Sequence, residues 1–307
     1  MPTNTPFSPY RGRFAPSPSG RLHFGSLVTA LASYLDARSN QGTWVVRIED
    51  IDPPREEAGA ADAILRSLEA HGLHSDEPIL YQRHRLNHYE HLIAHLIDKG
   101  LAYYCDCNRK RLSELGSIYD GHCRTRGLTQ TQSAVRIKLY DAPNICLDDW
   151  RSYTDRLQGN ITQNLRTQAG DQVIKRRDGL HGYTLAVIAD DIAQGITHIV
   201  RGSDLLEVTP RHLAIYDLLN QSDILPNQPP HYAHTPLVID KQGYKLSKQN
   251  RAPAIDDGCA SENLIRALTF LHHPPPPEFY GAPPSLLLTW ATAQFSLSAV
   301  GASSRQA

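Results

Sequence analysis

The sequence predicts an α/β protein built around a parallel sheet, and three observations support this fold class. Strand-like and helix-like segments alternate over residues 9–99 and again over 184–240. The segment TWVVRI at 43–48 is short, apolar and rich in β-branched residues, which is typical of a strand buried on both faces. A stretch rich in proline and glycine joins the first expected strand to the first expected helix. Such alternation is the βαβ pattern of a parallel sheet.

The expected elements follow in a regular order. In the first third we expect a strand at 9–15, a helix at 25–39, a strand at 43–48, and helices at 56–71 and 84–99. The helix at 56–71 starts with acidic residues, which the helix dipole favours, and stops at Gly72. Later we expect a helix at 184–194, a strand at 196–200, a helix at 209–220 and a strand at 237–240. Thr209 and Pro210 suit the N-cap and first position of their helix.

The middle of the chain interrupts this alternation. Residues 102–180 are irregular and indicate an insertion between two halves of the sheet domain, at 1–101 and 181–250. Residues 251–307 form a C-terminal segment with one expected helix at 261–271, a proline run and a final dozen residues expected to fray. No apolar run is long enough for a membrane span and no apolar leader is visible, so we expect a cytoplasmic protein.

Charge and composition limit the classes of function. With 307 residues, 40% of them hydrophobic, the chain can bury a core. A net charge of −1 argues against a protein that coats nucleic acid over its whole surface. Basic residues do cluster locally, at 109–111 and 175–177 among other places. Either a solvated surface or a local RNA contact explains them.

Residues 13–27, RFAPSPSGRLHFGSL, form a stiff turn with few large side chains. Gly20 and Gly25 remove side chains where a nucleotide approaches, and the N-terminus of the following helix attracts anions. The stretch matches neither the Walker motif nor the dinucleotide-binding motif. His23 is placed to contact phosphate, whereas a proline-rich loop with an incidental histidine is the plain alternative.

A second motif, KLSK at 245–248, follows a turn that contains Gly243. Lys245 and Lys248 on a flexible loop suit a charge that appears during reaction, such as a departing pyrophosphate. The motif is weak alone, but the two motifs together are specific.

The pair resembles the HIGH and KMSKS signatures of class I aminoacyl-tRNA synthetases, here HFGS and KLSKQ, with Ser26 in place of the second histidine. The sequences RIEDID at 47–52, VRGSDLL at 200–206, TPR at 209–211 and HYAHTPL at 231–237 resemble the glutamate-specific branch. The resemblance covers about residues 11–250. Because few residues follow Lys248, we expect no anticodon-binding domain. The chain therefore resembles most the glutamyl-queuosine tRNA(Asp) synthetases, which are truncated paralogues of the glutamyl-tRNA synthetases.

The resemblance implies a Rossmann-like class I synthetase domain with a zinc-containing insertion and a short, mainly helical C-terminal segment. It implies a ligase that activates L-glutamate with ATP and Mg²⁺, without tRNA, and transfers it to queuosine at the wobble position of tRNA(Asp). We expect a monomer without a membrane partner. Two enzymatic alternatives stay open: charging of a tRNA 3′ end, and adenylation of another carboxylate without tRNA. A non-catalytic RNA-binding protein conflicts with the intact His23, Lys245 and Lys248.

Glutamate needs a cation for its side-chain carboxylate and an anion for its ammonium group. Arg13 and Arg201 are the candidate cations, because a guanidinium group binds both carboxylate oxygens. The resemblance implies a pocket formed by Arg13, Phe14, Ala15, Pro16, Ser17, Tyr183 and Arg201. It implies that Glu49 holds the ammonium, although Asp50 and Asp52 are close enough to compete.

The chemistry implied is attack of the glutamate α-carboxylate on the α-phosphorus of ATP, which relies on position and charge. His23 would stabilise the α-phosphate. Gly25 would leave room for ATP, and Lys248, assisted by Lys245, would hold the phosphates.

Three of the five cysteines, Cys105, Cys107 and Cys123, lie close together in the sequence. Such a cluster favours a metal site over disulfides in a cytosolic chain. Zinc is usually bound by four ligands, so a fourth residue is needed. His122 is the first candidate on chemical grounds, whereas the resemblance implies Tyr119. Reduced cysteines without metal are the plain alternative. The surrounding basic residues suit phosphate contacts with RNA: Arg109, Lys110, Arg111, Arg124 and Arg126.

Overall fold

A five-stranded parallel sheet forms the centre of the structure, a computed structural model that describes residues 9–116, 118–145, 147–240, 243, 245–246 and 253–306. The strand order is β10-β9-β1-β2-β3, and each neighbouring pair is parallel. The strands are β1 (Arg11–Phe14), β2 (Thr43–Ile48), β3 (Leu80–Tyr81), β9 (His198–Gly202) and β10 (His231–Thr235). The predicted parallel α/β class is therefore confirmed.

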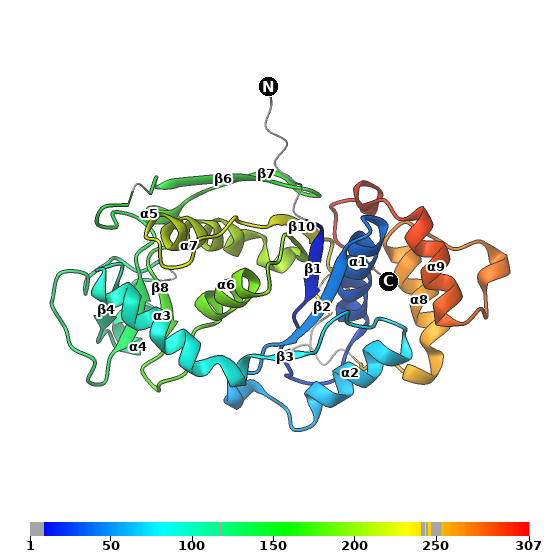
Figure 1. Ribbon diagram of the computed structural model, residues 1–307, viewed down its shortest axis with the longest axis horizontal. Coiled ribbons are helices and arrows are strands. Elements are labelled where there is room, and N and C mark those ends of the chain that lie inside the picture. The colour runs from blue at the N-terminus through cyan, green and yellow to red at the C-terminus, as the bar shows by residue number, and fades with distance from the viewer. Residues whose placement is uncertain are drawn as a thin grey trace.

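Helices cover both faces of the sheet (Figure 1). One face carries α1 (Phe24–Ser39), α2 (Ala60–Ala70), α8 (Ala260–Phe270) and α9 (Pro284–Gln294), which share one core. The helices α3 (Leu86–Asp98), α6 (Tyr183–Ala193) and α7 (Thr209–Gln221) share a second core. Strand β2 shows why its sequence is apolar throughout: Trp44 and Val46 face the core of α1, and Val45 faces Leu213 of α7. No helix among the described residues combines the length and apolar character needed to cross a bilayer.

The strand order makes β1 a switch point of the sheet. The chain passes from β1 through α1 to β2 on one side of β1, and much later it passes from α6 into β9 on the other side. Ligands of open α/β sheets bind beyond the carboxyl ends of the strands at such a point. The turn that begins at Arg13 leaves the sheet there.

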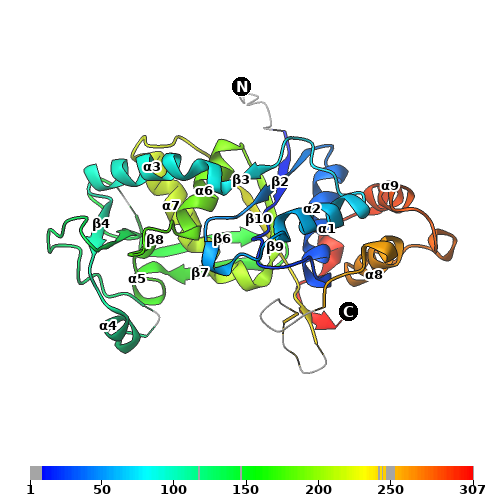
Figure 2. The ribbon, with the colours of Figure 1, turned by 90° about the horizontal axis from the view of Figure 1, so that it is seen from below.

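Residues 102–180 form an antiparallel unit. Its sheet has the order β4 (Ala102–Cys105), β5 (Ala134–Ile137), β8 (Gln172–Lys175), and a separate hairpin joins β6 (Trp150–Asp155) to β7 (Gly159–Asn164). Two short helices, α4 (Arg109–Glu114) and α5 (Leu165–Gln168), complete it. Figure 2 shows β4, β8 and α4 at the end of the molecule opposite α8 and α9, while the hairpin reaches back toward β10.

One expected helix start and one expected N-cap are wrong for local reasons. Helix α2 begins at Ala60 rather than 56, because residues 53–55 form a 3-10 turn and Gly59 before the helix has a φ of 75°. Thr209 does not cap α7. Its hydroxyl accepts a hydrogen bond from Arg201 Nη2 at 2.7 Å and donates to the carbonyl of Leu205 at 3.1 Å.

The C-terminal residues pack rather than fray, which corrects the expectation for the last dozen positions. Strand β12 (Arg305–Gln306) pairs in parallel with β11 (Val238–Ile239). The Arg305 side chain donates to the carbonyl of Val300 at 2.9 Å, and Val300 is buried in the core of α1. The segment after residue 253 thus belongs to the sheet domain.

Candidate active site

The turn after β1 leads directly into α1. His23 is the N-cap residue of α1, and its Nδ1 accepts a hydrogen bond from the Ser26 backbone N–H at 3.2 Å. The Ser26 hydroxyl lies 3.0 Å from His23 Nε2. A Cβ on Gly25 would lie 3.3 Å from the imidazole ring and 3.6 Å from the carbonyl oxygen of Leu246. Glycine at this position therefore keeps the helix N-terminus open to an anion.

A cleft lies at the carboxyl ends of β1 and β9. Its lining includes ten residues that the sequence singled out: Arg13, Phe14, Ala15, Pro16, Ser17, His23, Gly25, Tyr183, Arg201 and Lys245. Glu49 lines an adjoining hollow, and the two share Ser17 and Tyr183. The fold thus gathers residues from distant parts of the chain around one space.

The lysine motif approaches this cleft from β11. Lys245 Nζ pairs with Asp204 Oδ2 at 2.6 Å, and Leu246 N–H donates to the carbonyl of Val238 at 2.8 Å. The turn before the motif is present, because Gly243 N–H donates to the carbonyl of Asp240 at 3.0 Å and Gly243 has a φ of 86°. Lys248 lies outside the described residues.

Four buried charged side chains lie beside the cleft. Asp191 Oδ1 on α6 receives Arg13 Nε at 3.2 Å and Arg47 Nη2 at 2.8 Å. Arg47 Nη2 also lies 3.3 Å from Glu49 Oε1. The sequence interpretation missed Arg47 and Asp191. Two adjacent acids at 190–191 in the apolar run YTLAVIADDIA were the signal that could have found the second.

The two carboxyl groups of this cluster have opposite pKa shifts. Burial raises the pKa of Glu49 to about 7, although the guanidinium groups of Arg47 and Arg13 oppose the rise. Burial alone would also raise the pKa of Asp191, but Arg13 and Arg47 hold it below its usual value. Burial raises the pKa of Tyr183 to about 12, so its hydroxyl stays protonated. Glu49 is thus the member of the cluster that changes charge near neutrality.

The competing acids next to Glu49 have other partners. Asp50 accepts the backbone N–H of Arg83 at 2.9 Å and lies 3.3 Å from its guanidinium group. Asp52 lines the same hollow as Glu49 and pairs with Arg176 at 3.0 Å. Glu49 is the acid that lies against Arg47 and near Arg13.

The three clustered cysteines lie in one place, with their Sγ atoms within 4.8 Å of one another. Cys107 Sγ and Cys123 Sγ are 3.5 Å apart, and the Tyr119 hydroxyl lies 3.6 Å from Cys105 Sγ and 3.7 Å from Cys107 Sγ. Zn–S bonds of about 2.3 Å separate the sulfurs of a tetrahedral site by roughly 3.8 Å. The donors therefore fit zinc in kind and spacing. His122 is exposed, whereas the Tyr119 hydroxyl lies beside the sulfurs of Cys105 and Cys107. A carboxylate oxygen of Asp106 also lies 3.5 Å from Cys123 Sγ.

Each cysteine sulfur also receives an arginine. The pairs are Arg136 Nε to Cys105 Sγ at 3.4 Å, Arg111 Nη1 to Cys107 Sγ at 3.8 Å and Arg126 Nη1 to Cys123 Sγ at 3.6 Å. Cationic donors favour thiolates over thiols, and metal ligation requires thiolates. Burial opposes this at Cys105, but the hydrogen bonds, among them that from Arg136, outweigh burial and lower the pKa of the thiol, whereas burial raises the pKa of Cys107 to about 11.

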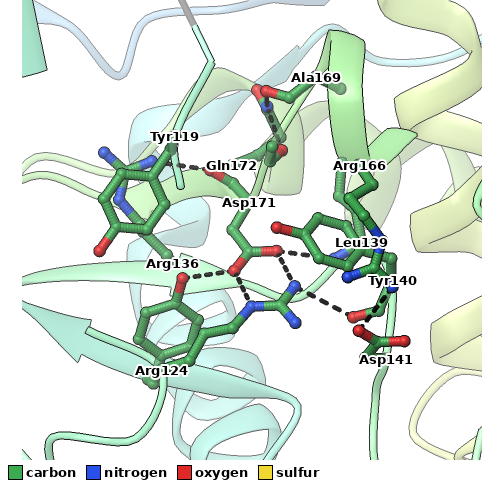
Figure 3. A network of polar contacts seen from close by, with 12 residues as sticks. Tyr119, Arg124, Arg136, Leu139, Tyr140, Asp141, Arg166, Ala169, Asp171 and Gln172 are labelled. Carbon is green, nitrogen blue, oxygen red and sulfur yellow. Dashed lines mark hydrogen bonds and ion pairs between the residues drawn. The ribbon is translucent and has the colours of Figure 1, made fainter. Parts of the chain in front are cut away.

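A buried carboxylate, that of Asp171, lies at the centre of a network of polar contacts with Arg124 and Arg136 (Figure 3). Asp171 binds the Arg124 guanidinium through both oxygens, at 2.6 and 2.5 Å, and also accepts the Tyr103 hydroxyl. Its carbonyl oxygen accepts Arg136 Nη1 at 2.7 Å, and the Arg136 guanidinium lies 3.8 Å from the centre of the Tyr119 ring. Asp171 thereby holds Arg124, which follows Cys123 in the chain, and Arg136, whose guanidinium group lies over the Tyr119 ring.

The basic residues around the cysteine loop differ in their availability to RNA. Arg124 is half-buried between Asp171 and the Tyr140 ring, which corrects its expected role in phosphate contact. Arg111 pairs with Asp120 at 2.6 Å, and Arg126 pairs with Asp106 at 2.5 Å. Arg109 and Lys110 lie exposed on α4.

The switch point, the anion-accepting turn with its histidine and the arginine-lined cleft together define a class I synthetase catalytic domain. The chain belongs to the family described as tRNA synthetases class I (E and Q), catalytic domain, which matches residues 10–270. It is therefore a ligase of the aminoacyl-tRNA synthetase type, from a family that uses ATP.

The chain is similar to named relatives and to solved structures within this family. It is 48% identical over 294 residues to a protein of Cronobacter sakazakii named Glutamyl-Q tRNA(Asp) synthetase, covering 96% of this chain and 94% of the relative. It is similar to a crystal structure of a glutamate tRNA ligase from Elizabethkingia meningosepticum with its amino acid, at 28% identity and a TM-score of 0.66. That match covers 79% of this chain and about half, 52%, of the ligase. A glutamate-tRNA synthetase from Elizabethkingia anophelis shares the fold, with a TM-score of 0.77 over 98% of this chain and 68% of its own, at 23% identity.

Proposed function

We propose that the protein activates L-glutamate with ATP to glutamyl-adenylate without tRNA and then transfers the glutamate to queuosine in the anticodon of tRNA(Asp). The observation that carries the activation step is the gathering of Arg13, Glu49 and Arg201 around a cleft that also receives the N-terminus of α1 at His23. The transfer step is supported by the names of relatives such as the one from Cronobacter sakazakii.

The amino-acid end of the cleft has the charges that glutamate needs. Arg13 and Arg201 are the cations for its side-chain carboxylate, and Glu49 is the anion for its ammonium group. Phe14, Ala15, Pro16, Ser17 and Tyr183 form the remaining wall. The glutamate α-carboxylate is already ionised, so no side chain needs to act as a base. Its oxygen forms a bond to the α-phosphorus while the bond to pyrophosphate breaks.

The other end of the cleft accepts the triphosphate. His23 and the backbone N–H groups at the start of α1 stabilise the α-phosphate, and Gly25 leaves room for it. Lys245 and Lys248 hold the leaving pyrophosphate together with Mg²⁺ bound to ATP. Lys245 exchanges Asp204 for phosphate in this step.

Cys105, Cys107, Cys123 and Tyr119 hold a structural zinc ion in this proposal, and the sulfur spacing supports it. Zinc supplies a fixed tetrahedral cross-link for the loop. Metal analysis of the purified protein tests the assignment. Tyr119→Phe should lose zinc to a chelator faster than the wild type, whereas His122→Ala should not. The reverse result would make His122 the ligand.

The unit at 102–180 is the RNA-facing part of the protein in this proposal, inserted between halves at 1–101 and 181–250. The exposed pair Arg109 and Lys110 on α4 supports it, because such residues contact phosphates without reading sequence. Reversing both charges to Glu should weaken tRNA(Asp) binding and leave adenylate formation unchanged. Arg66→Glu on α2, exposed and outside this unit, is the matched control. Unchanged affinity would place the RNA surface elsewhere.

Two measurements test the proposed reaction. ATP–pyrophosphate exchange should depend on glutamate and need no tRNA. Exchange that depends on another carboxylate would favour a nucleotidyltransferase that does not act on tRNA. Labelled glutamate on tRNA(Asp) should then be mapped by nuclease digestion, with label expected in the anticodon fragment. Label at the 3′ end would favour ordinary tRNA charging.

A further inference from the structure

Arg201 on β9 is a buried arginine, and one of its guanidinium nitrogens has no hydrogen-bond partner among the described residues. Its Nε donates to His234 Nε2 at 3.0 Å, and its Nη2 donates to Thr209 Oγ1 at 2.7 Å. Within the described part of the chain, the buried Nη1 has no hydrogen-bond partner, and Arg201 lines the cleft. A buried cationic N–H without a partner is costly, so its presence in a cleft indicates a ligand.

The partner of Nε, His234 on β10, is fixed in one tautomer by its neighbours. Because Arg201 Nε is a donor, His234 Nε2 must offer its lone pair. The ring proton then lies on Nδ1, which donates to Asp155 Oδ2 at 2.6 Å. The side chains of His234 and Asp155 are both fully buried. Burial lowers the pKa of His234 although Asp155 opposes the shift, so the ring is neutral as this arrangement requires.

Asp155 comes from the antiparallel unit rather than from the parallel sheet. It is the last residue of β6, at the tip of the β6–β7 hairpin that lies along β10 (Figure 1). Its Oδ1 accepts the backbone N–H groups of Leu157 at 3.0 Å, Gln158 at 2.9 Å and His234 at 3.1 Å. These bonds fix the hairpin tip, and the other carboxylate oxygen, Oδ2, remains to accept the hydrogen bond from the His234 ring.

We propose that Asp155 and His234 are positioning residues for the Arg201 guanidinium group in amino-acid binding. Asp155 sets the His234 tautomer, and His234 orients Arg201 so that Nη1 is presented to the side-chain carboxylate of the substrate. The inference rests on the proposed function, in which Arg201 binds that carboxylate. It makes the hairpin of the antiparallel unit a determinant of glutamate affinity, although neither residue touches the substrate.

Asp155→Asn is the discriminating change, because it keeps the Oδ1 acceptor for three backbone N–H groups and replaces Oδ2 with an N–H donor. An amide donor facing Nδ1 forces the ring proton onto Nε2, where it opposes the Arg201 Nε–H. In ATP–pyrophosphate exchange, the KM for glutamate should rise at least about tenfold, while the KM for ATP and kcat stay within about twofold. Thr154→Val, exposed and one residue away, is the matched control and should change none of these values.

His234→Gln provides the second test, because glutamine cannot undergo the tautomer change. It too should raise the KM for glutamate. In its background, Asp155→Asn should then have little further effect, whereas in the wild-type background the effect should be full. An unchanged KM in Asp155→Asn, or fully additive effects of the two substitutions, would overturn the inference. Wild-type exchange that does not depend on glutamate would instead overturn the proposed function, and this inference with it.

Discussion

Glutamate binding is expected to strengthen as the pH rises through neutrality, because burial raises the pKa of Glu49 to about 7. Only the ionised carboxylate attracts the substrate ammonium group. A group with this pKa is ionised to roughly a tenth at about pH 6 and to roughly nine tenths at about pH 8. The dissociation constant for glutamate should therefore fall about tenfold across this interval.

Calorimetric titration with glutamate alone is the suitable assay, because ATP has phosphate groups that titrate in the same range. Burial lowers the pKa of His212 well below its ordinary value and also lowers the pKa of His234, which moves the titration of both rings toward the acid side of this range. Glu49→Gln should bind glutamate weakly and without this pH dependence, whereas the exposed Glu69→Gln on α2 should behave as the wild type. A wild-type constant that varies less than about twofold, or an unchanged pH dependence in Glu49→Gln, would refute the reasoning.

The raised pKa of Glu49 also predicts how the stability of the folded protein depends on pH. The pKa of Glu49 in the folded protein, about 7, exceeds its ordinary value of 4.5, so the folded state keeps a proton that the unfolded chain releases between these values. The stability that this proton contributes is present below the lower value and is lost as the pH rises through about 7. The melting temperature of Glu49→Gln should therefore decline less over this range than that of the wild type.

Three further predictions concern the phosphate end and the cysteine loop. Gly25→Val should raise the KM for ATP at least about tenfold and leave glutamate binding unchanged in calorimetry, because even a Cβ would lie 3.3 Å from the His23 ring. Equal losses for both substrates would contradict this. Lys248→Ala should slow pyrophosphate exchange at saturating glutamate far more than it weakens glutamate binding, and a wild-type rate would remove the lysine from the mechanism. Asp171→Asn should release zinc to a chromophoric chelator faster than the wild type, because it loosens Arg124; equal release rates would count against this support.

The turn at 13–27 and its place in the fold were predictable because they depend on local rules. Prolines, glycines and an N-cap histidine determine backbone conformation within a few residues. The apolar strand β2 was predictable for a similar reason, since burial on both faces requires apolar residues at every position. The candidate metal cluster of Cys105, Cys107 and Cys123 was predictable from the spacing of the three cysteines. Chemistry alone favoured His122 for the fourth place and the resemblance implied Tyr119, and the folded loop brings the Tyr119 hydroxyl within 3.7 Å of two of the sulfurs.

The contacts that orient the site could not be predicted, because they join residues that only folding brings together. Asp191 is one of two acids in an apolar helix, and nothing in its neighbourhood reveals that Arg13 and Arg47 share it. Asp155 is a hairpin residue 79 positions from His234. Their pairing depends on how the antiparallel unit packs on β10.

Local pattern was thus sufficient for the fold class and for the stiff turn at 13–27, and the resemblance added ten of the residues that line the cleft. The burial of the charged side chains, and the charge states that follow from it, could not be predicted from local pattern. The pKa of Glu49 arises from the exclusion of water and from arginines elsewhere in the packed structure. The Nη1 of Arg201 is buried without a partner among the described residues only because of how the chain packs around it. Electrostatic energies depend on distance and on the surrounding medium, and both are properties of the packed molecule rather than of the order of its residues.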